Sequence, residues 1–328
     1  MKKGVLPFLV LLFFGSQALS ETNEIRIAKQ YGINYLPFIV LEEHKLIEKY
    51  AKEAGLGDVK VLWATFGGGA ATNDALLSGN IDINSNGVAP FLILWGKTKG
   101  KVKALAASDK ANYILNTSNA NVKSLRDFTD KDKIALPAVK VSIQALLLQI
   151  AAAQEFGIKN YNKLDHLTVT LKHPDALISI LSSKSEITTH FATEPFATIE
   201  LQNPNIRQVI SSDEIVGKGL TTGLVSTSEK FYNENPKLVK VFLKSLNEAA
   251  EWINNNEKEA AKLYVKVTKS KESEELIYKI LSERDVKFSI KPTDITLFSD
   301  FLYEIGSIKT KPTQKELFFD EISNDIYK

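Results

Sequence analysis

One stretch of the sequence decides the fold: residues 63–94 read WATFGGGAATNDALLSGNIDINSNGVAPFLIL. The pattern predicts a strand over residues 59–66, then a glycine loop and a short helix that ends near Gly79. A second strand is expected at 81–84, followed by a small-residue loop and a helix with Pro90 in its first turn. Two neighbouring strand-to-helix loops of this kind are typical of a small-ligand site at the carboxyl ends of parallel strands.

The glycine loop, Gly67, Gly68 and Gly69, favours a site where backbone groups bind an anion or a carbonyl. Glycines let a ligand come close to the backbone, and the first N–H groups of a helix have no intrahelical partner. The loop has neither the lysine of a Walker motif nor a G-x-G-x-x-G pattern, so it does not predict a nucleotide site. A flexible turn is the structural alternative. The next loop, with Asn86 and Gly87, has similar character and favours binding.

Strands and helices alternate along the remaining chain. Beyond the opening stretch, strands are expected at 25–30, 102–107, 113–115, 133–136, 167–171, 187–191, 206–210 and 224–226. Helices are expected at 37–54, at 142–156 and from Pro236 onward. The length exceeds what one small core accommodates, which favours two α/β lobes. We expect one lobe to comprise residues 21–115 and 222–328, and the other to comprise 116–221.

Residues 1–20 have the composition of a secretory signal peptide, with Lys2 and Lys3 before a short apolar run. That run is too short for a membrane-spanning helix. Cleavage would leave 39 basic against 39 acidic residues (41 minus the two lysines), so no global field favours nucleic acid or a membrane surface. The chain has no cysteine, which excludes disulfides and a lipid anchor on a cysteine. We therefore expect a cleaved protein that is free in the periplasm.

A family resemblance rests on four segments: FGGGAATNDALLSGNIDI with NGVAPF, then IRIAKQYG, KIALPAVKVSIQALLLQ and FATEPF. In this order they resemble the periplasmic solute-binding proteins of nitrate-, sulfonate- and taurine-type ABC importers. The resemblance covers nearly the whole chain after residue 20. It implies a type II periplasmic-binding-protein-like fold, in which two mainly parallel sheets flanked by helices enclose a ligand cleft. It also implies delivery of the ligand to an inner-membrane permease with its ATPase, by a monomer without a cofactor.

Candidate ligand contacts lie in the loops that follow the expected strands. They are Gln30 and Tyr31, Phe66 with the glycine loop, Asn86 and Gly87, then Ala138, Val139, Lys140, Ser142, His190, Phe191, Thr193 and Glu194. Each has a structural alternative: Ser142 as a helix cap, Lys140 in solvent, Glu194 at a helix N-terminus. Family members often carry a tryptophan before the acid of the acid-Pro-Phe segment, where this chain has Thr193. This departure removes a large aromatic wall that the resemblance implies for the cleft.

Catalytic patterns are absent from the sequence. The four histidines show no close metal-binding spacing, cysteine chemistry is impossible, and no G-x-S-x-G elbow occurs. We therefore expect a binding protein without a metal, for a small anionic or strongly hydrogen-bond-accepting solute. One alternative is a thiamine-pyrimidine precursor or similar heterocycle stacked on Tyr31, Phe66 or Phe191. Another is a periplasmic enzyme or sensor that uses the same cleft. Loop residues set specificity, so the sequence does not name the ligand.

Overall fold

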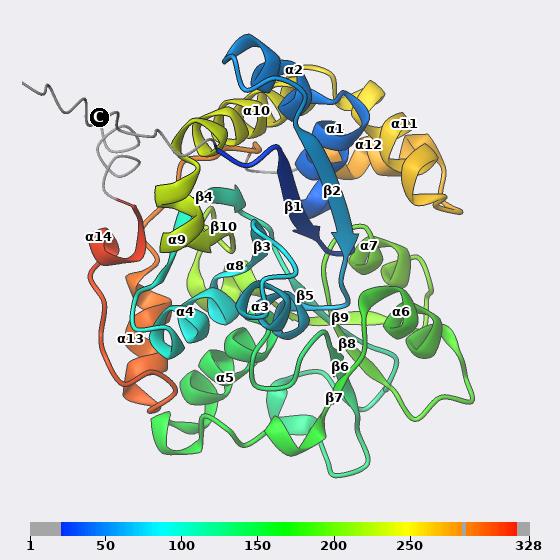
Figure 1. Cartoon of the computed structure of the whole chain (residues 1–328). Helices are drawn as coiled ribbons and strands as arrows, with labels where there is room; N and C mark the ends of the chain where they lie inside the picture. The colour runs from blue at the N-terminus through cyan, green and yellow to red at the C-terminus, as the bar shows by residue number, and fades with distance from the viewer. Residues whose placement is uncertain (1–20, 284–286, 320–328) are drawn as a thin grey trace, which may run out of the picture.

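The computed structural model describes residues 21–283 and 287–319; the expected signal peptide lies outside these residues. Its elements form two α/β halves, with β1, β2 and α10–α12 at the top of Figure 1 and β5–β9 with α5–α7 below. Two sheet systems organise them. No helix within the described ranges is both long and apolar enough to cross a bilayer.

The first sheet system contains five strands: β1 (Glu24–Lys29), β2 (Lys60–Thr65), β3 (Asn84–Gly87), β4 (Val102–Asp109) and β10 (Gly223–Ser228). β1 and β2 pair in parallel, and a parallel bridge between Ile27 and Ile83 connects β1 to the segment before β3. β10 lies between β3 and β4 and is antiparallel to both. Four strands therefore run in one direction and β10 in the other.

The second sheet repeats this arrangement with β7 (Thr168–Thr170), β6 (Ile134–Leu136), β8 (Thr189–Ala192), β5 (Ile114–Thr117) and β9 (Arg207–Ser211), in that order. β6 is parallel to β7 and β8, whereas β5 is antiparallel to β8 and β9. Each half thus has a mainly parallel sheet with one reversed strand. The predicted class, α/β with sheets flanked by helices, is confirmed.

Helices cover both sheets. They are α1 (Leu36–Glu43), α2 (Leu46–Glu53), α3 (Gly69–Leu77), α4 (Val88–Lys97), α5 (Ile143–Phe156), α6 (His173–Leu181), α7 (Phe196–Leu201), α8 (Ser212–Val216), α9 (Glu229–Glu234), α10 (Pro236–Asn255), α11 (Glu257–Thr268), α12 (Glu274–Ser282), α13 (Thr296–Glu304) and α14 (Gln314–Leu317). The long helix predicted after Pro236 is α10, with that proline at its first position.

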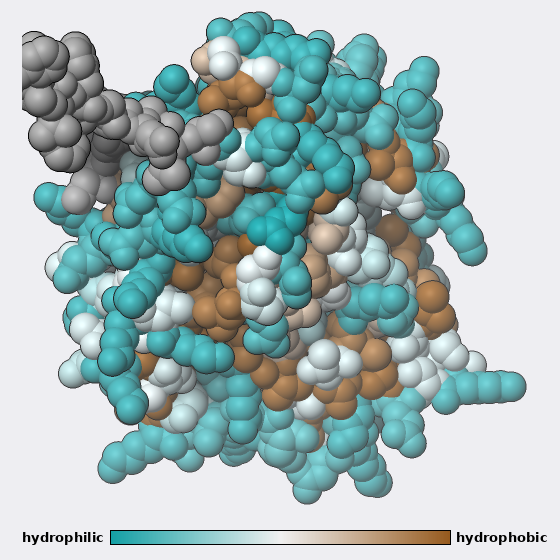
Figure 2. Space-filling view, viewed as in Figure 1, coloured by the Kyte–Doolittle hydropathy of each residue, from teal (hydrophilic) through white to brown (hydrophobic). Residues whose placement is uncertain are grey.

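Two large apolar clusters form the core. One packs α1 and α2 against α10–α12 around Phe38 and Phe242. The other is shared between the halves, because Phe91 of α4 and Leu147 of α5 both belong to it. Figure 2 shows apolar side chains gathered over the middle of the molecule and hydrophilic ones around its periphery. The two halves therefore meet over apolar surface.

Two details of the predicted secondary structure are wrong, and one predicted strand is present but pairs in the other sheet. The helix expected at 37–54 is broken between α1 and α2, where Lys45 adopts a left-handed conformation with φ of 50°. The small-residue loop expected at 84–87 is strand β3, paired with β10. The strand expected at 113–115, which we assigned to the first lobe, is β5 and pairs inside the second sheet.

Candidate functional site

A small cavity of ≈ 30 Å³, open to solvent on one side, lies between the two halves. From the first half it is lined by Gln30, Tyr31, Asn34, Tyr35, Gly67, Gly69, Gly87 and Pro90, and from the rest of the chain by Tyr113, Pro137, Ser142, Ile143, Gln144, His173 and Thr193. Several of these residues follow the carboxyl ends of β1, β2, β6, β7 and β8. This is where a ligand is expected in open α/β sheets.

Three helices begin at this cavity. Gly69 is the first residue of α3, Ile143 of α5 and His173 of α6, and all three line the cavity. α3 belongs to the first half, and the other two belong to the second. A helix N-terminus carries a partial positive charge and N–H groups without intrahelical partners. The cavity lining includes no Asp, Glu, Lys or Arg. The site is therefore suited to an anion that is held by neutral donors and helix dipoles.

The two halves approach each other at the glycines. A β-carbon on Gly68 would lie 2.8 Å from the carbonyl oxygen of Pro137, which belongs to the opposite half. A β-carbon on Gly87 would lie 2.9 Å from Cβ of Ile143. Gly68 has an extended backbone (φ 177°, ψ 169°), so the close approach explains this glycine and a special conformation does not. The loops around the cavity can meet only because these side chains are absent.

Polar atoms without partners point to a ligand at the same place. The Thr193 hydroxyl and the Asn34 side-chain oxygen are buried, and neither makes a hydrogen bond within the part of the chain that the structure describes. Asn34 Nδ2 donates to the Tyr113 hydroxyl at 3.4 Å. Burying such groups without partners is costly. Because both residues line the cavity, an accepting group of a bound solute could pair with the Thr193 hydroxyl, and a donating group or a water molecule with Asn34 Oδ1.

A chain of buried hydrogen bonds leads from the cavity into the second half. Gln144 Nε2 lies 3.2 Å from His173 Nε2, and His173 Nδ1 lies 2.8 Å from His190 Nε2. His190 Nδ1 then lies 2.5 Å from Glu200 Oε1, and Asn116 Nδ2 donates to Glu200 Oε2 at 2.9 Å. The His173 ring stacks on Phe196, with ring centroids 5.5 Å apart. All members of the hydrogen-bonded chain are buried.

Burial shifts the pKa values of the three ionisable side chains in this hydrogen-bonded series, which are His173, His190 and Glu200. Desolvation raises the pKa of Glu200 to about 8, against a hydrogen bond from Asn116 that favours the carboxylate. Desolvation lowers the pKa of His190 to about 3, and it lowers that of His173 well below its usual value, with a further contribution from His190. Burial thus favours the uncharged form of both groups, a neutral His190 imidazole and a protonated Glu200 carboxyl.

Only some of the candidate ligand contacts predicted from the sequence line the cavity. Gln30, Tyr31, Gly67, Gly69, Gly87, Ser142 and Thr193 line it. Ser142 also caps α5, because its hydroxyl accepts a hydrogen bond from Ala145 N at 3.2 Å. Gln30 donates to the Ser85 carbonyl at 3.1 Å, which orients its amide.

The other candidates lie around the cavity without lining it. Phe66 packs on an apolar cluster of the first half, and Phe191 is fully buried in the shared core. Asn86 donates to Asn73 Oδ1 at 2.8 Å and thereby supports α3.

In the second half, Ala138 is buried, the Val139 N–H donates to Thr170 Oγ1 at 3.2 Å, and Lys140 is exposed. Glu194 accepts hydrogen bonds from Thr198 and lines a separate cavity with Lys110, Asp213 and Lys279. His190 reaches the site only through His173.

Sequence reasoning missed Asn34, Tyr113, Gln144 and His173 as cavity residues. His173 carried a usable signal, since it begins a helix directly after strand β7, as Gly69 does after β2. Gln144 sits one residue inside α5 and reads as an ordinary helix residue. Asn34 and Tyr113 come together only through the fold.

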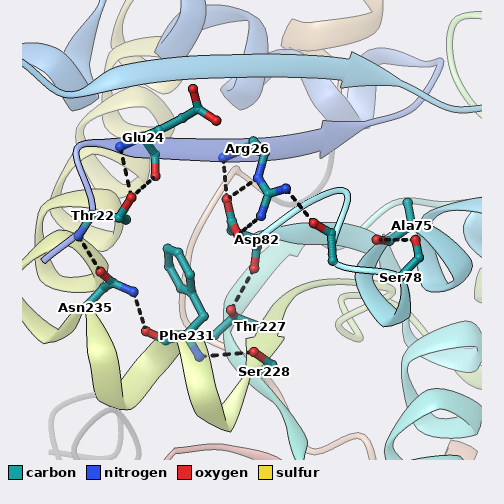
Figure 3. A network of polar contacts seen from close by, with 11 residues as sticks. Thr22, Glu24, Arg26, Ala75, Ser78, Asp82, Thr227, Ser228, Phe231 and Asn235 are labelled. Atoms are coloured by element: carbon teal, nitrogen blue, oxygen red, sulfur yellow. Dashed lines mark hydrogen bonds and ion pairs between the residues drawn. The ribbon is translucent and has the colours of Figure 1, made fainter.

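A polar network away from the cavity fixes the start of β1 (Figure 3). Arg26 Nε donates to Asp82 Oδ2 at 2.9 Å, and Nη2 lies 2.6 Å from Oδ1. The Thr227 hydroxyl of β10 donates to the Asp82 carbonyl at 2.7 Å. Thr22 N donates to Asn235 Oδ1 at 2.8 Å, just before α10. The network holds β1 against its neighbours and so positions Gln30 beyond its other end.

The described residues contain no group of three His, Asp or Glu side chains arranged to hold a metal ion. A model of the NMT1-like family matches residues 19–268, which is more than half of the chain. The chain belongs to the NMT1-like family.

Relatives of this NMT1-like chain include proteins named for the solutes they bind. A Bacillus subtilis (strain 168) protein named as aliphatic sulfonates-binding is 26% identical over 278 residues, covering 80% of this chain and 78% of that protein. The alkanesulfonate-binding protein SsuA of Xanthomonas axonopodis pv. citri, solved bound to MOPS, superposes with a TM-score of 0.72 at 17% identity, covering 92% and 98% of the two chains.

The periplasmic nitrate-binding protein NrtA of Synechocystis PCC 6803 superposes with a TM-score of 0.66 at 16% identity, covering 93% and 88%. The structural neighbours have the periplasmic binding protein fold, so the fold expected from the family resemblance is confirmed. Together these relatives support a role as a solute-binding protein.

Proposed function

We propose that this protein is the solute-binding component of an ABC importer and that it captures a small oxyanion of the sulfonate class. The observation that carries the proposal is the convergence of three helix N-termini, from both halves, on a cavity whose lining lacks charged side chains. A cation would find no carboxylate among the lining residues. An anion would find backbone N–H groups, the Gln144 amide and the Thr193 hydroxyl.

The mechanism follows from the two halves. Residues 21–113 with 222–328 would form one lobe and residues 114–221 the other, because β5 begins at Ile114 and pairs in the second sheet. The chain would cross between the lobes just before the reversed strands β5 and β10. A ligand between Gly69 and His173 would contact both lobes and stabilise the state in which Gly68 meets Pro137. Closure driven by such a bridging ligand is a common binding mechanism. The closed form would then be the one presented to a permease and its ATPase.

Sulfonates are preferred over heterocycles for a specific reason. Of the three aromatic residues considered for stacking, Phe66 and Phe191 do not line the cavity and only Tyr31 does. Tyr35 and Tyr113 also line the cavity, so aromatic surface alone does not favour one class over the other. The three helix N-termini at the cavity favour an anion over a neutral heterocycle. The sulfonate names of two relatives agree with an anion of this class.

The proposal also places the protein outside the inner membrane, after removal of residues 1–20, as a monomer that performs no chemistry on its ligand. Two measurements test this part. Mass spectrometry of the periplasmic protein should give an N-terminus near residue 19 or 21. Ligand recovered after denaturation should be chemically unchanged; recovery of a converted product at catalytic turnover would favour an enzyme.

The ligand class is tested by calorimetry on protein expressed from its full-length sequence and purified without sulfonate buffers. The panel would comprise methanesulfonate, taurine, nitrate, acetate and an aminopyrimidine. We expect the two sulfonates to bind most tightly, at one site. Tight binding of the pyrimidine alone would replace the proposed ligand class, and binding of nitrate alone would narrow it to a planar anion.

A further inference from the structure

We propose that the chain Gln144–His173–His190–Glu200 makes anion binding proton-linked, so that the cavity takes up one proton together with its ligand. Glu200 holds that proton although it does not line the cavity, and it is therefore a positioning residue. The inference rests on the proposed function, because it concerns the same cavity.

The first step is the geometry of the chain. His173 is the first residue of α6 and lines the cavity, whereas Glu200 lies on α7 and is fully buried. Between them His190, in the centre of the second sheet, contacts His173 through one ring nitrogen and Glu200 through the other. Each histidine thus uses both nitrogens, and a change at Glu200 must change what His173 offers at the cavity.

The hydrogen bonds that link Glu200, His190, His173 and Gln144 can all point in either of two directions. With Glu200 ionised, His190 Nδ1–H donates to the carboxylate, His173 Nδ1–H donates to His190 Nε2, and His173 Nε2 accepts from the Gln144 amide. With Glu200 protonated, its O–H donates to His190 Nδ1, His190 Nε2–H donates to His173, and His173 Nε2–H points toward Gln144. One proton on Glu200 therefore converts His173 Nε2 from an acceptor into a donor.

The third step brings this change to the ligand. Gln144 lines the cavity and meets His173 Nε2 at 3.2 Å with one end of its amide. Whichever end meets the ring, the other is left for the cavity. When Nε2 accepts, the amide turns its NH₂ to the ring and its oxygen to the ligand, which disfavours an anion. When Nε2 donates, the amide oxygen meets the ring and the NH₂ group is free to donate to an anion.

The fourth step concerns other charges near the chain. The strand residues of β5, β6 and β8 contribute no ionisable side chain besides His190. At the start of α6, Lys172 lies 3.5 Å from Asp175, and before α7 Glu194 accepts hydrogen bonds from Thr198. Glu155 of α5 pairs with Arg126 at the opposite end of that helix. Of the groups packed around the chain, Glu200 is thus the one placed to reverse it.

The pH range in which ligand binding should become proton-linked follows from burial, which raises the pKa of Glu200 to about 8. A ligand that favours the protonated form raises it further by linkage. Below pH 7 the proton is already present, so binding is insensitive to pH. Above pH 8 the ligand must bring the proton with it, and the affinity should fall by about tenfold per pH unit.

The experiment measures methanesulfonate binding by calorimetry at pH 6, 7, 8 and 9, in two sulfonate-free buffers of different ionisation enthalpy. The sulfonate itself stays ionised throughout, so any proton exchanged with buffer belongs to the protein. We expect close to one proton taken up per ligand at pH 9, little uptake at pH 6, and an affinity about tenfold lower at pH 9 than at pH 7.

Glu200→Gln supplies the decisive variant. Its amide can donate to His190 and accept from Asn116, which imitates the protonated acid. The variant should bind methanesulfonate at pH 9 as tightly as at pH 6, without proton uptake. Asp175→Asn, which removes the neighbouring half-exposed acid, is the matched control and should retain the pH dependence of the wild type.

The outcomes separate the two proposals. Binding of methanesulfonate at every pH without proton uptake by the wild-type protein would overturn the proton linkage and leave the proposed function standing. A folded Glu200→Gln protein with the wild-type pH dependence would also overturn it. Failure of methanesulfonate to bind at any pH, including pH 6, would remove the proposed ligand class and this inference together. The wild-type measurement decides the matter even if Glu200→Gln does not fold.

Discussion

Gly68→Ala should separate folding from ligand binding. Gly68 is the N-cap residue directly before α3 and has an extended conformation that alanine adopts freely, so each lobe should fold as before. The added β-carbon would lie 2.8 Å from the Pro137 carbonyl oxygen and 3.1 Å from Pro137 Cβ. Restoring ordinary contact requires the two loops to separate by about 0.6 Å (3.4 minus 2.8).

That separation acts on the ligand. A displacement of about 0.6 Å stretches a hydrogen bond from one lobe to a ligand held by the other, and a lost bond to a charged group costs roughly 1.5–3 kcal/mol. The affinity should therefore fall by about tenfold to hundredfold. Gly67→Ala is the matched comparison, because its β-carbon would meet only Lys172 Cβ, at an ordinary 3.5 Å.

Calorimetry with methanesulfonate measures the affinities, and thermal unfolding without ligand checks the fold. The expected result is a larger loss for Gly68→Ala than for Gly67→Ala, at nearly unchanged unfolding temperatures. An unchanged affinity for a folded Gly68→Ala protein would refute the idea that Gly68 and Pro137 must meet around the ligand. A large drop in unfolding temperature would instead show that the contact supports the ligand-free fold.

Three further predictions follow from single groups. Thr193→Val removes a buried hydroxyl without a described partner, so the ligand-free protein should be no less stable while methanesulfonate affinity falls by about tenfold; unchanged affinity would take Thr193 out of the site. Lys140→Gln changes an exposed side chain outside the cavity lining and should alter the affinity by less than about twofold, whereas a tenfold loss would restore the lysine as a ligand contact. The free energy of unfolding should fall between about pH 6.5 and pH 8, because in this window folded Glu200 keeps a proton that the unfolded chain, with a pKa of 4.5, has lost. Over these roughly 1.5 pH units the free energy of unfolding decreases by at most about 2 kcal/mol. Denaturant titrations should show the decrease in the wild type and not in Glu200→Gln. An equal dependence of the free energy of unfolding on pH in both proteins would contradict the raised pKa.

Helix starts that glycine or proline marks in the sequence were predicted correctly. The glycine loop before α3 and the proline that begins α10 were both visible in the sequence. The alternation of strands and helices was sufficient for the fold class. These features depend on neighbouring residues, so a single sequence contains them.

Features that depend on distant partners escaped prediction. Strand β3 consists of Asn84, Ser85, Asn86 and Gly87, which resemble a loop, yet they pair with β10 about 140 residues later and bond to Asn73. The break at Lys45 needs a left-handed lysine, for which the sequence has no glycine or proline signal.

Among the candidate site residues, those in loops at strand ends line the cavity more often than the others. Glycines and helix starts mark such loops in a sequence, whereas the side chains that reach the cavity from within helices carry no local mark. Gln144 and His173 become cavity residues through a hydrogen-bonded chain that crosses α5, α6, β8 and α7. Only the assembled fold brings these four elements together.

In the proposed function, the cavity binds a small sulfonate-like anion through helix N-termini and neutral donors. The most direct test compares methanesulfonate with dimethyl sulfone, which has nearly the same shape and no charge, by calorimetry on the wild-type protein at pH 6. We expect saturable binding of methanesulfonate at one site and at least hundredfold weaker binding of the sulfone. Equal affinity for the two compounds, or no binding of methanesulfonate, would contradict it.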